Sequence, residues 1–467
     1  MIHESSKWLS ENIGYSIEYW DKLKRSLNKK FCRPDPITTQ TKFSKHIRDK
    51  AIAAGFIFDP SAPHEPPKKN QYIGNIPSLK DNFDDYPTEE AKQLYNFPTQ
   101  FNAYGQRTNS GVSIVDWDKV HLRCNRLVKE LVMEGKSCTQ VKVKNNLTKK
   151  NEVYTLKKHG KVILAAGSQS PRLLMRTPIE NKYIGKRVND HICLPLGLYI
   201  VSKDLKARIG GADVYEPIFG STLVTSNCGQ NDAGVKGVVF LDFFTGSLEN
   251  LSFMVSSLYL CFVPFNCLKR LFGRYPILFT FLSNSIRILL TVLVFVVDVL
   301  TFKFLNESNE LKLTTSLIKF KAVREGHYEK ENDQITLRFF EDENDFVIAE
   351  KAIKENLAFL ESIGSRPNIL IRKLFQLLTK IPYDEDEVER YVKNFSKRTL
   401  LSEQHLAGGC VFGEAIDKGL NCASDTGKVF GTDNIHVADL SAVPLPRCST
   451  QMTAYLVGYH VGKQMFH

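Results

Sequence analysis

The chain lacks several patterns that define whole classes of protein. Its ten cysteines are scattered, with no Cys-x-x-Cys pair and no spacing typical of metal ligands. This favours a reduced, intracellular protein without a metal site over a disulfide framework. The first residues contain no apolar segment of the kind found in secretory signal peptides. No basic stretch is interleaved with aromatic residues, which argues against nucleic acid as a partner.

A glycine loop of the form Gly-x-Gly-x-x-Gly is also absent. Such a loop holds the pyrophosphate of a dinucleotide at the start of a βαβ unit. The chain nevertheless has 467 residues, 43% of them hydrophobic, which is enough for two or three domains or for one two-lobed enzyme. Its net charge of +11 favours anionic partners such as a membrane surface or a phosphate-bearing cofactor.

The most hydrophobic part of the sequence is the segment 253–305, which contains the run SIRILLTVLVFVVDVLTFKF. A membrane-spanning helix needs about 20 apolar residues. Arg287, Asp298 and Lys303 flank or interrupt this run, and a charge inside a bilayer is costly. Two alternatives stay open: an insertion that enters or faces a membrane, and a helix buried under a substrate-binding lobe.

Residues 162–171 predict a buried strand, a turn of small residues and a helix. The strand is Val-Ile-Leu, the turn contains Ala166 and Gly167, and Pro171 suits the first turn of a helix. Backbone amides at such a helix start can bind a phosphate or a ribose, although many α/β folds use the same turn only for packing. Alternating residues predict three strands before this unit, within 121–135, 138–146 and 152–160.

The middle of the chain shows fewer chemical signals. Short strands and turns are expected within 192–250, and TSLIKFKAV and DQITLRFFED predict a hairpin. Two helices should follow, one in FVIAEKAIKENLAFLESIG that ends at Gly364, and one in DEDEVERYVKNFSKR.

The last sixty residues contain three motifs close together. His405 precedes a glycine pair in HLAGGC, where glycines let the backbone pass close to a planar ligand. Asp439 ends the apolar strand of IHVADLSAVP, a position from which an acid can bind ligand hydroxyls or can instead cap a turn. CSTQMTAYLVGYHVGKQ then begins a helix, with Ser449 or Thr450 as its cap.

Together these motifs resemble the glucose–methanol–choline (GMC) oxidoreductases, which are flavoproteins that take a hydride from an alcohol carbon. KVILAAGSQSPRLLMR is similar to the second strand and turn of the family's flavin domain, and IGKRVNDH is similar to the loop that follows it. HLRCNRLVKEL is similar to the strand whose valine, here Val128, lies near the adenine. The resemblance runs from about residue 105 to the end of the chain, and HxxGGC is closest to the cholesterol-oxidase-like branch.

The resemblance implies a role for each matching residue. His405 would take or orient the hydroxyl proton of the substrate while hydride leaves the carbinol carbon for flavin N5. The family's second catalytic residue, a His or an Asn, falls here on Ser449 or Thr450, which are weaker positioning groups. The helix they begin would stabilise the reduced flavin through its positive N-terminal end. The positions implied to contact FAD are Val128, Ala166, Gly167, Gly409, Asp439, Leu440, Gln451 and Met452.

The expected fold is an incomplete, Rossmann-like α/β flavin-binding domain interleaved with an α+β substrate-binding lobe. Its predicted parts are a helical and loop segment of the substrate lobe (1–119), a flavin-domain segment (120–191), the substrate lobe with its hydrophobic insertion (192–400) and a C-terminal flavin-domain segment (401–467).

The expected activity is FAD-dependent oxidation of a hydrophobic or lipid-like alcohol, at a membrane surface. The alternative is a truncated or degenerate relative without catalysis, a membrane-associated lipid-binding remnant. The absent glycine loop has three explanations: the sequence is a fragment, it pairs with a separate N-terminal flavin-binding half, or it no longer binds flavin.

Overall fold

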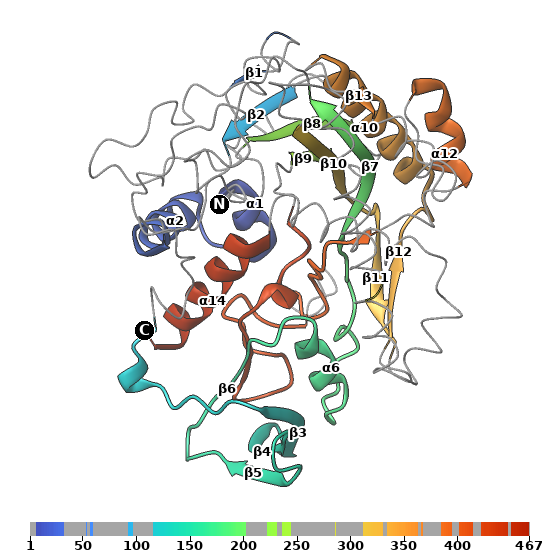
Figure 1. Ribbon diagram of the computed structural model, residues 1–467. Coiled ribbons are helices and arrows are strands. Elements are labelled where there is room, and N and C mark those ends of the chain that lie inside the picture. Colours follow the sequence, from blue (N-terminus) through green and yellow to red (C-terminus); the bar gives the residue numbers. More distant parts are fainter. Residues whose placement is uncertain are drawn as a thin grey trace.

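The computed structural model describes residues 6–31, 53, 57–58, 92–96, 115–201, 222–230, 236–243, 285, 312–329, 334–362, 366–367, 384–394, 401–413, 422–446 and 450–466. Their elements form two groups (Figure 1). One group is a large sheet with helices beside it, and the other surrounds a short pair of parallel strands.

The large sheet has eight strands in the order β1-β2-β8-β9-β10-β7-β13, and β14 also pairs with β7. All of these pairings are antiparallel except β1 with β2. The strands are β1 (Ile57–Phe58), β2 (Lys92–Asn96), β7 (His191–Val201), β8 (Thr222–Gln230), β9 (Lys236–Phe243), β10 (Lys312–Lys321), β13 (Arg366–Pro367) and β14 (Leu401–Ser402). Helix α10 (Glu343–Ser362) packs against β8, β9 and β10, and α12 (Val388–Asn394) packs against α10 (Figure 1). This group forms the lobe expected to bind substrate.

Strand β7 leads from this sheet toward the second group of elements. Its first residues pair with β14, with Ile192 opposite Ser402 and Cys193 opposite Leu401. The antiparallel contact continues beyond the strands, because Asn189 and Ala407 exchange two backbone hydrogen bonds of 3.1 and 3.0 Å. The loop after β14 is therefore held directly against the start of β7.

The second group is centred on β6 (Val162–Leu164) and β15 (Ile435–Val437), which pair in parallel. Their register is Ile435 opposite Val162 and Val437 opposite Leu164. Helix α6 (Gln169–Met175) follows β6 after a four-residue turn. A separate antiparallel sheet of β3 (Arg126–Glu134), β4 (Ser137–Asn145) and β5 (Asn151–Thr155) lies at the end of the molecule (Figure 1).

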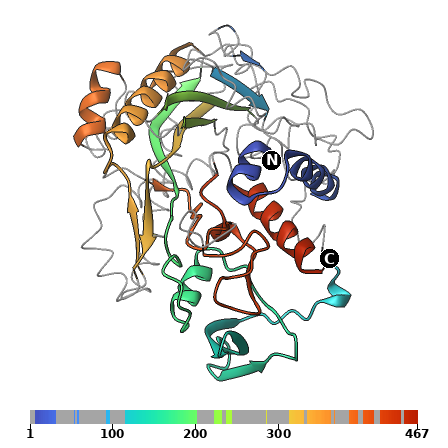
Figure 2. The same cartoon turned by 180° about the vertical axis from the view of Figure 1, so that it is seen from behind.

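The first two helices pack against the last one. Helices α1 (Ser6–Ile13) and α2 (Ile17–Phe31) lie beside α14 (Thr450–Phe466) in both ribbon views (Figures 1 and 2). Tyr19 donates its hydroxyl hydrogen to Nδ1 of His460 at 2.8 Å, and Trp20 is fully buried in the same core as Leu164. The start of the chain thus packs against the C-terminal helix and shares a hydrophobic core with β6 and β15.

The strand–turn–helix predicted at 162–171 is confirmed, as are the strands β3, β4 and β5 and the C-terminal helix. The predicted hairpin of TSLIKFKAV with DQITLRFFED is wrong. The first of these strands, β10, pairs with β7 and β9 in the large sheet. The second, β12 (Ile335–Arg338), pairs instead with β11 (Arg324–Tyr328).

The hydrophobic insertion predicted at 253–305 lies outside the described residues apart from residue 285. Within the described part of the chain, no helix combines the length and apolar character needed to cross a membrane.

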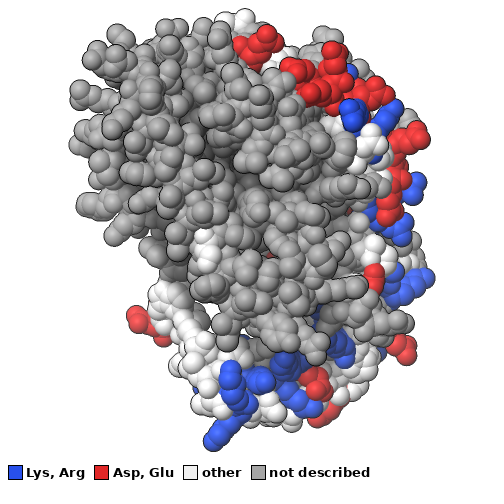
Figure 3. All heavy atoms as spheres, turned by 45° about the vertical axis from the view of Figure 1, so that its right-hand side comes forward, with Lys and Arg blue, Asp and Glu red and all other residues white. Residues whose placement is uncertain are grey.

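Charge is unevenly distributed over the surface. Figure 3 shows Lys and Arg side chains at the end formed by β3–β5, and Asp and Glu side chains gathered at the opposite end, near α10 and α12. The exposed lysines of the first end are Lys129, Lys136, Lys142, Lys149, Lys150, Lys157, Lys158 and Lys161. Within the described surface, the β3–β5 end is therefore the part that would attract an anionic partner.

Candidate active site

The carboxyl ends of β6 and β15 meet at a buried carboxylate. Asp439 follows β15 and is 8% exposed. Its Oδ2 accepts hydrogen bonds from the backbone of Gly167 at 2.9 Å and from the hydroxyl of Ser170 at 2.5 Å. Its Oδ1 accepts one from the backbone of Ser441 at 2.8 Å and so caps the short 3₁₀ helix Leu440–Ala442. One side chain thus ties the turn after β6 to the loop after β15.

The turn after β6 leaves open space beside the strand ends. Gly167 has φ +57, and a Cβ added there would meet no atom within 4 Å. Ala166 is exposed, and its backbone N–H donates to the Ser170 hydroxyl at 3.1 Å. In open α/β sheets, ligands bind outside the carboxyl ends of parallel strands. Burial raises the pKa of Asp439 above its usual range, although the hydrogen bonds that it accepts, with that from Ser170 the strongest, oppose the shift.

The glycine pair of HLAGGC is explained by close packing. A Cβ on Gly408 would lie 1.8 Å from the backbone oxygen of Arg187, and a Cβ on Gly409 would lie 2.6 Å from the ring of Pro171. Both glycines also have positive φ, at +82 and +96. The backbone next to them runs beside the Asp439 loop, because Cys410 donates to the carbonyl of Ser441 at 2.8 Å. The glycines bring the two C-terminal motifs together.

His405 lies in the loop that follows β14 and is half-buried. Its backbone N–H donates to Oδ1 of Asp190 at 2.8 Å, and Oδ2 of the same carboxylate accepts the hydroxyl of Ser402. Asp190 is fully buried, and burial raises its pKa. The imidazole of His405 meets that of His191, with 3.1 Å between their Nδ1 atoms. His405 is therefore a structured residue with a fixed side-chain partner.

His191 connects two motifs that are far apart in sequence. Besides its contact with His405, its Nε2 lies 2.9 Å from the carbonyl oxygen of Pro446. Pro446 is in the loop that leads to α14, which begins at Thr450. The ring of His191 is 3% exposed, so both contacts are shielded from water.

Of the other predicted residues near the C-terminus, two lie in the hydrophobic core and two lie at the start of α14. Leu440 and Met452 belong to the hydrophobic core, at 9% and 0% exposure. Thr450 is buried at the first position of α14, whereas Gln451 is half-buried and donates to the Tyr455 hydroxyl at 3.3 Å. Ser449 lies outside the described residues.

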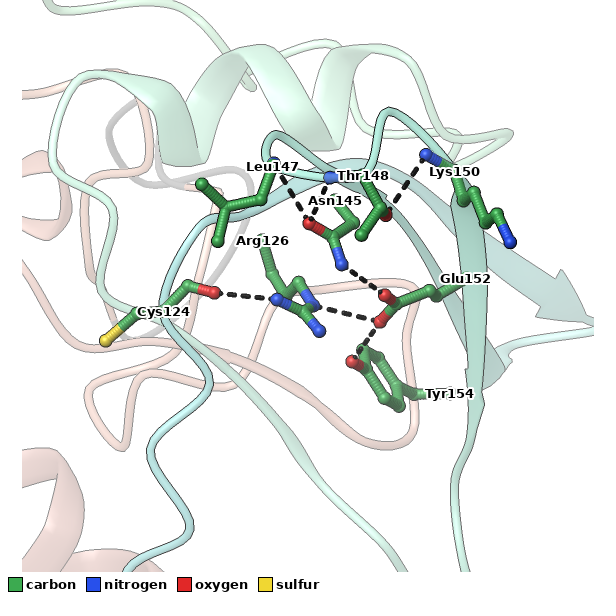
Figure 4. A network of polar contacts seen from close by, with 8 residues as sticks. All are labelled: Cys124, Arg126, Asn145, Leu147, Thr148, Lys150, Glu152 and Tyr154. Carbon is green, nitrogen blue, oxygen red and sulfur yellow. Dashed lines mark hydrogen bonds and ion pairs between the residues drawn. The ribbon is translucent and has the colours of Figure 1, made fainter.

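Val128 is on β3, with 40% of its surface exposed. Its sheet is held by Glu152, which accepts hydrogen bonds from Arg126 at 2.9 Å, Tyr154 at 2.6 Å and Asn145 at 2.8 Å (Figure 4). These bonds, with that from Tyr154 the strongest, lower the pKa of Glu152 to about 2. These bonds join β3, β4 and β5 beside the exposed side chain of Val128.

A cavity of about 470 Å³ lies elsewhere, between the end of α6 and β11. Thr177, Asn181, His327 and Tyr328 are among its lining residues, and none of the predicted site residues lines it. The described part of the chain holds no cluster of His, Cys, Asp and Glu suited to a metal ion.

Sequence reasoning missed two functional candidates, His191 and Ser170. The dipeptide Asp190-His191 closes the quoted motif IGKRVNDH, which was the available signal, but only the fold brings it to His405. Ser170 is in the predicted helix start, and its fully buried hydroxyl binds Asp439.

The structure thus joins a pair of parallel strands, with a carboxylate at their ends, to a large antiparallel sheet. Residues 325–458 match the family GMC oxidoreductase, in its C-terminal part. A protein of Acanthamoeba polyphaga mimivirus described as a truncated, inactive GMC-type oxidoreductase is 36% identical over 66 residues, which are 14% of this chain and 74% of that protein. The chain therefore belongs to the GMC oxidoreductase family, and the family implies FAD as the cofactor.

Solved structures with a similar fold include two oxidases and an FAD-dependent oxidoreductase, all of low sequence identity. A formate oxidase superposes with a TM-score of 0.60 at 14% identity, over 99% of this chain and 81% of that one. Pyridoxine 4-oxidase from Mesorbium loti gives 0.56 at 12% identity, with the same coverage of 99% and 81%. An FAD-dependent oxidoreductase from Chaetomium thermophilum gives 0.52 at 13% identity, over 90% and 71%. These likenesses assign a flavin-binding α/β fold.

The described residues fit one part of an FAD molecule. Oδ1 of Asp439 accepts a single hydrogen bond in the structure, so the carboxylate retains acceptor capacity for a ligand hydroxyl. The exposed turn at Ala166 and the space beside Gly167 lie next to it. The glycine loop that would hold the pyrophosphate is absent from the sequence, so the fit is confined to the ribose side of the cofactor.

Proposed function

We propose that this protein catalyses the FAD-dependent oxidation of an alcohol, with His405 as the acid/base residue. The observation that supports this most directly is the position of His191. It contacts the ring of His405 and the carbonyl of Pro446, and so joins the HLAGGC loop to the loop before α14. The two segments that the family uses for its catalytic pair are thereby brought together.

In this proposal the imidazole of His405 takes the proton of the substrate hydroxyl, which makes the carbinol carbon a better hydride donor. Thr450, buried at the start of α14, or Ser449 directly before it, gives a hydrogen bond to the substrate oxygen. FAD, when bound, supplies the acceptor for the hydride. The backbone loop of His405 is held by Asp190, which limits the entropy lost when the substrate binds.

We assign the cofactor contacts to four groups of this chain. Asp439 would accept a ribose hydroxyl, the turn at Ala166 and Gly167 would lie along the nucleotide, and Val128 would cover the adenine. The start of α14, with Gln451, would face the pyrimidine edge of the flavin ring, where negative charge develops on reduction. In support, Asp439 joins the turn after β6 to the loop after β15, and α14 packs against the 3₁₀ helix in that loop.

The domain division that goes with this function keeps 120–191 and 401–467 as flavin-domain segments and 192–400 as the substrate lobe. The pairing of β6 with β15 supports the first assignment, and the large sheet built from β7 to β10 supports the second. We infer that the protein works at a membrane surface and that its substrate is a hydrophobic or lipid-like alcohol. This inference rests on the sequence of 253–305 and on the basic charge.

The test begins with added FAD. Protein that retains flavin absorbance after desalting is screened with alcohols, and His405→Ala is compared with His121→Ala, which removes an exposed histidine. We expect His405→Ala to lower turnover by about 10²–10⁴ with flavin content unchanged, the usual scale for loss of a general acid/base. His121→Ala should have no effect. Equal turnover of the two variants would exclude His405 from the chemistry.

A second function is favoured by one specific observation. The curated relative that matches over 66 residues is described as truncated and inactive, and this chain also lacks the glycine loop. In this alternative the chain is a non-catalytic remnant that binds lipid or pairs with a separate flavin-binding half. Purified protein that stays colourless with added FAD, yet binds anionic lipid vesicles, would favour it over the enzyme.

A further inference from the structure

The ring of His191 has a fixed arrangement of hydrogens. Its Nε2 lies 2.9 Å from the carbonyl oxygen of Pro446, which can only accept a hydrogen bond. Nε2 therefore carries a hydrogen. Burial of the ring favours its neutral form, in which only one nitrogen is protonated, so Nδ1 of His191 is an acceptor.

This arrangement determines the hydrogens of His405 as well. The two Nδ1 atoms are 3.1 Å apart and the rings meet edge to face, at 84°. One hydrogen has to lie between these atoms, and the neutral ring of His191 does not provide it. It must be carried by Nδ1 of His405, which leaves the basic lone pair of His405 on Nε2.

We propose that His191 is a positioning residue that selects the Nδ1–H tautomer of His405 and so makes Nε2 its proton-accepting atom. This inference rests on the proposed function for its catalytic meaning. In the reaction the substrate O–H bond breaks and an N–H bond forms at Nε2 of His405, while the carbinol C–H bond breaks and a C=O bond forms. FAD, when bound, would accept the hydride with its electron pair. The bond from Nδ1 to His191 strengthens as His405 becomes charged, because a cationic donor makes a stronger hydrogen bond.

The carboxylate of Asp190 binds the backbone of His405 and not its ring. Asp190 directs Oδ1 to the backbone N–H of His405 and Oδ2 to the hydroxyl of Ser402. Asp190 thus fixes the backbone of His405, and the adjacent His191 orients its ring. The carbonyl of Pro446 completes the arrangement, since it is the group that fixes the tautomer of His191.

His460 is an internal reference, because its tautomer is the opposite of the one proposed for His405. His460 is fully buried, and its Nε2 lies 2.7 Å from the carbonyl oxygen of Asp425. Its Nδ1 lies 2.8 Å from the Tyr19 hydroxyl and accepts that hydrogen. His460 is therefore an Nε2–H histidine in the same molecule.

Imidazole ¹⁵N–¹H correlation spectra of histidine-labelled protein test the proposal. The signals of His405, His191 and His460 are assigned by their disappearance in His405→Asn, His191→Asn and His460→Gln. We expect His405 alone of the three to show Nδ1–H, with His191 and His460 as Nε2–H. A neutral His405 protonated at Nε2 in the wild-type protein would overturn the proposal. Only the three variants used for assignment have to fold for this test.

Two substitutions of His191 separate positioning from packing. His191→Phe keeps a ring but removes the acceptor, so His405 should shift to a mixture of tautomers while the His460 signals stay unchanged. His191→Asn places an amide near the position of Nδ1 and should restore the Nδ1–H form of His405 in part. An unchanged His405 tautomer in His191→Phe, with native His460 signals, would refute the role of His191.

The spectra and the turnover assay distinguish the two proposals. In flavin-loaded protein, His191→Phe should lower kcat by about 10²–10⁴ with little change in KM, the scale seen when a catalytic histidine has the wrong tautomer. Nδ1–H at His405 in a protein that binds no FAD would support the positioning role and contradict the proposed function. Turnover with Nε2–H at His405 would support the function and contradict the positioning role.

Discussion

The three hydrogen bonds of Asp439 allow a quantitative prediction for Asp439→Asn. An asparagine has one acceptor oxygen where aspartate has two. With that oxygen at the Oδ2 position the bonds from Gly167 and Ser170 survive, and the buried N–H of Ser441 then faces the amide NH₂ group. Leaving one buried donor without an acceptor costs about 1–3 kcal/mol.

This cost should appear as faster local opening of the site. Hydrogen exchange of the backbone amides in 165–175 and 438–445 should accelerate by about 5- to 150-fold, the equivalent of 1–3 kcal/mol. Exchange in β8 and β9, which belong to a different sheet from the strands beside Asp439, should not change. The assay is hydrogen exchange followed by mass spectrometry, which reads these peptides separately.

Asp433→Asn is the matched control. Asp433 is exposed and accepts one hydrogen bond, from the Ser137 hydroxyl at 2.8 Å. A surface change of this kind alters stability by no more than about 0.5 kcal/mol. If Asp439→Asn accelerates exchange no more than Asp433→Asn, the carboxylate of Asp439 does not hold the turn after β6 against the loop after β15, and this prediction is wrong.

Two further predictions concern backbone space and pH. Gly408→Ala should destabilise the protein by more than about 3 kcal/mol, because its Cβ would lie 1.8 Å from the oxygen of Arg187. Gly167→Ala, with no atom within 4 Å, should cost about 1–2 kcal/mol, and equal urea midpoints would refute this. Burial raises the pKa of Asp345 to about 6, so its stabilisation is present below pH 4 and lost as pH rises through 6. The melting temperature of Asp345→Asn relative to wild type should therefore rise over this range, and a constant difference would contradict the assignment.

Local signals in the sequence were enough for the elements around Asp439. Three consecutive apolar residues predict β6, and a small-residue turn followed by Pro171 predicts α6, because each signal depends only on neighbours in the chain. The two interpretations of Asp439, a ligand-binding acid and a turn cap, are compatible: its carboxylate caps the 3₁₀ helix after it and retains an acceptor position.

Strand partners could not be predicted in the same way. Residue patterns located both strands of the expected hairpin, but β10 pairs with β7, more than a hundred residues earlier. Period-two alternation defines which face of a strand is buried and leaves its partner undefined. The same limit applies to the site. His191 and His405 are 214 positions apart, and only the pairing of β7 with β14 brings their rings together.

The assembly of the histidine pair is physically separate from the binding of flavin. His405, His191, Asp190 and the Pro446 carbonyl are connected by bonds within 190–446, and none of those bonds uses the turn that would hold the nucleotide. These contacts do not involve a pyrophosphate-binding loop, so a chain without that loop can keep them. The tautomer of His405 and the retention of FAD can therefore be measured separately. A protein with both properties is the proposed enzyme, and one that retains FAD without the Nδ1–H tautomer is an enzyme with another acid/base arrangement. A protein with the tautomer but no FAD is a flavin-free relative with a preserved site, and one with neither is a remnant.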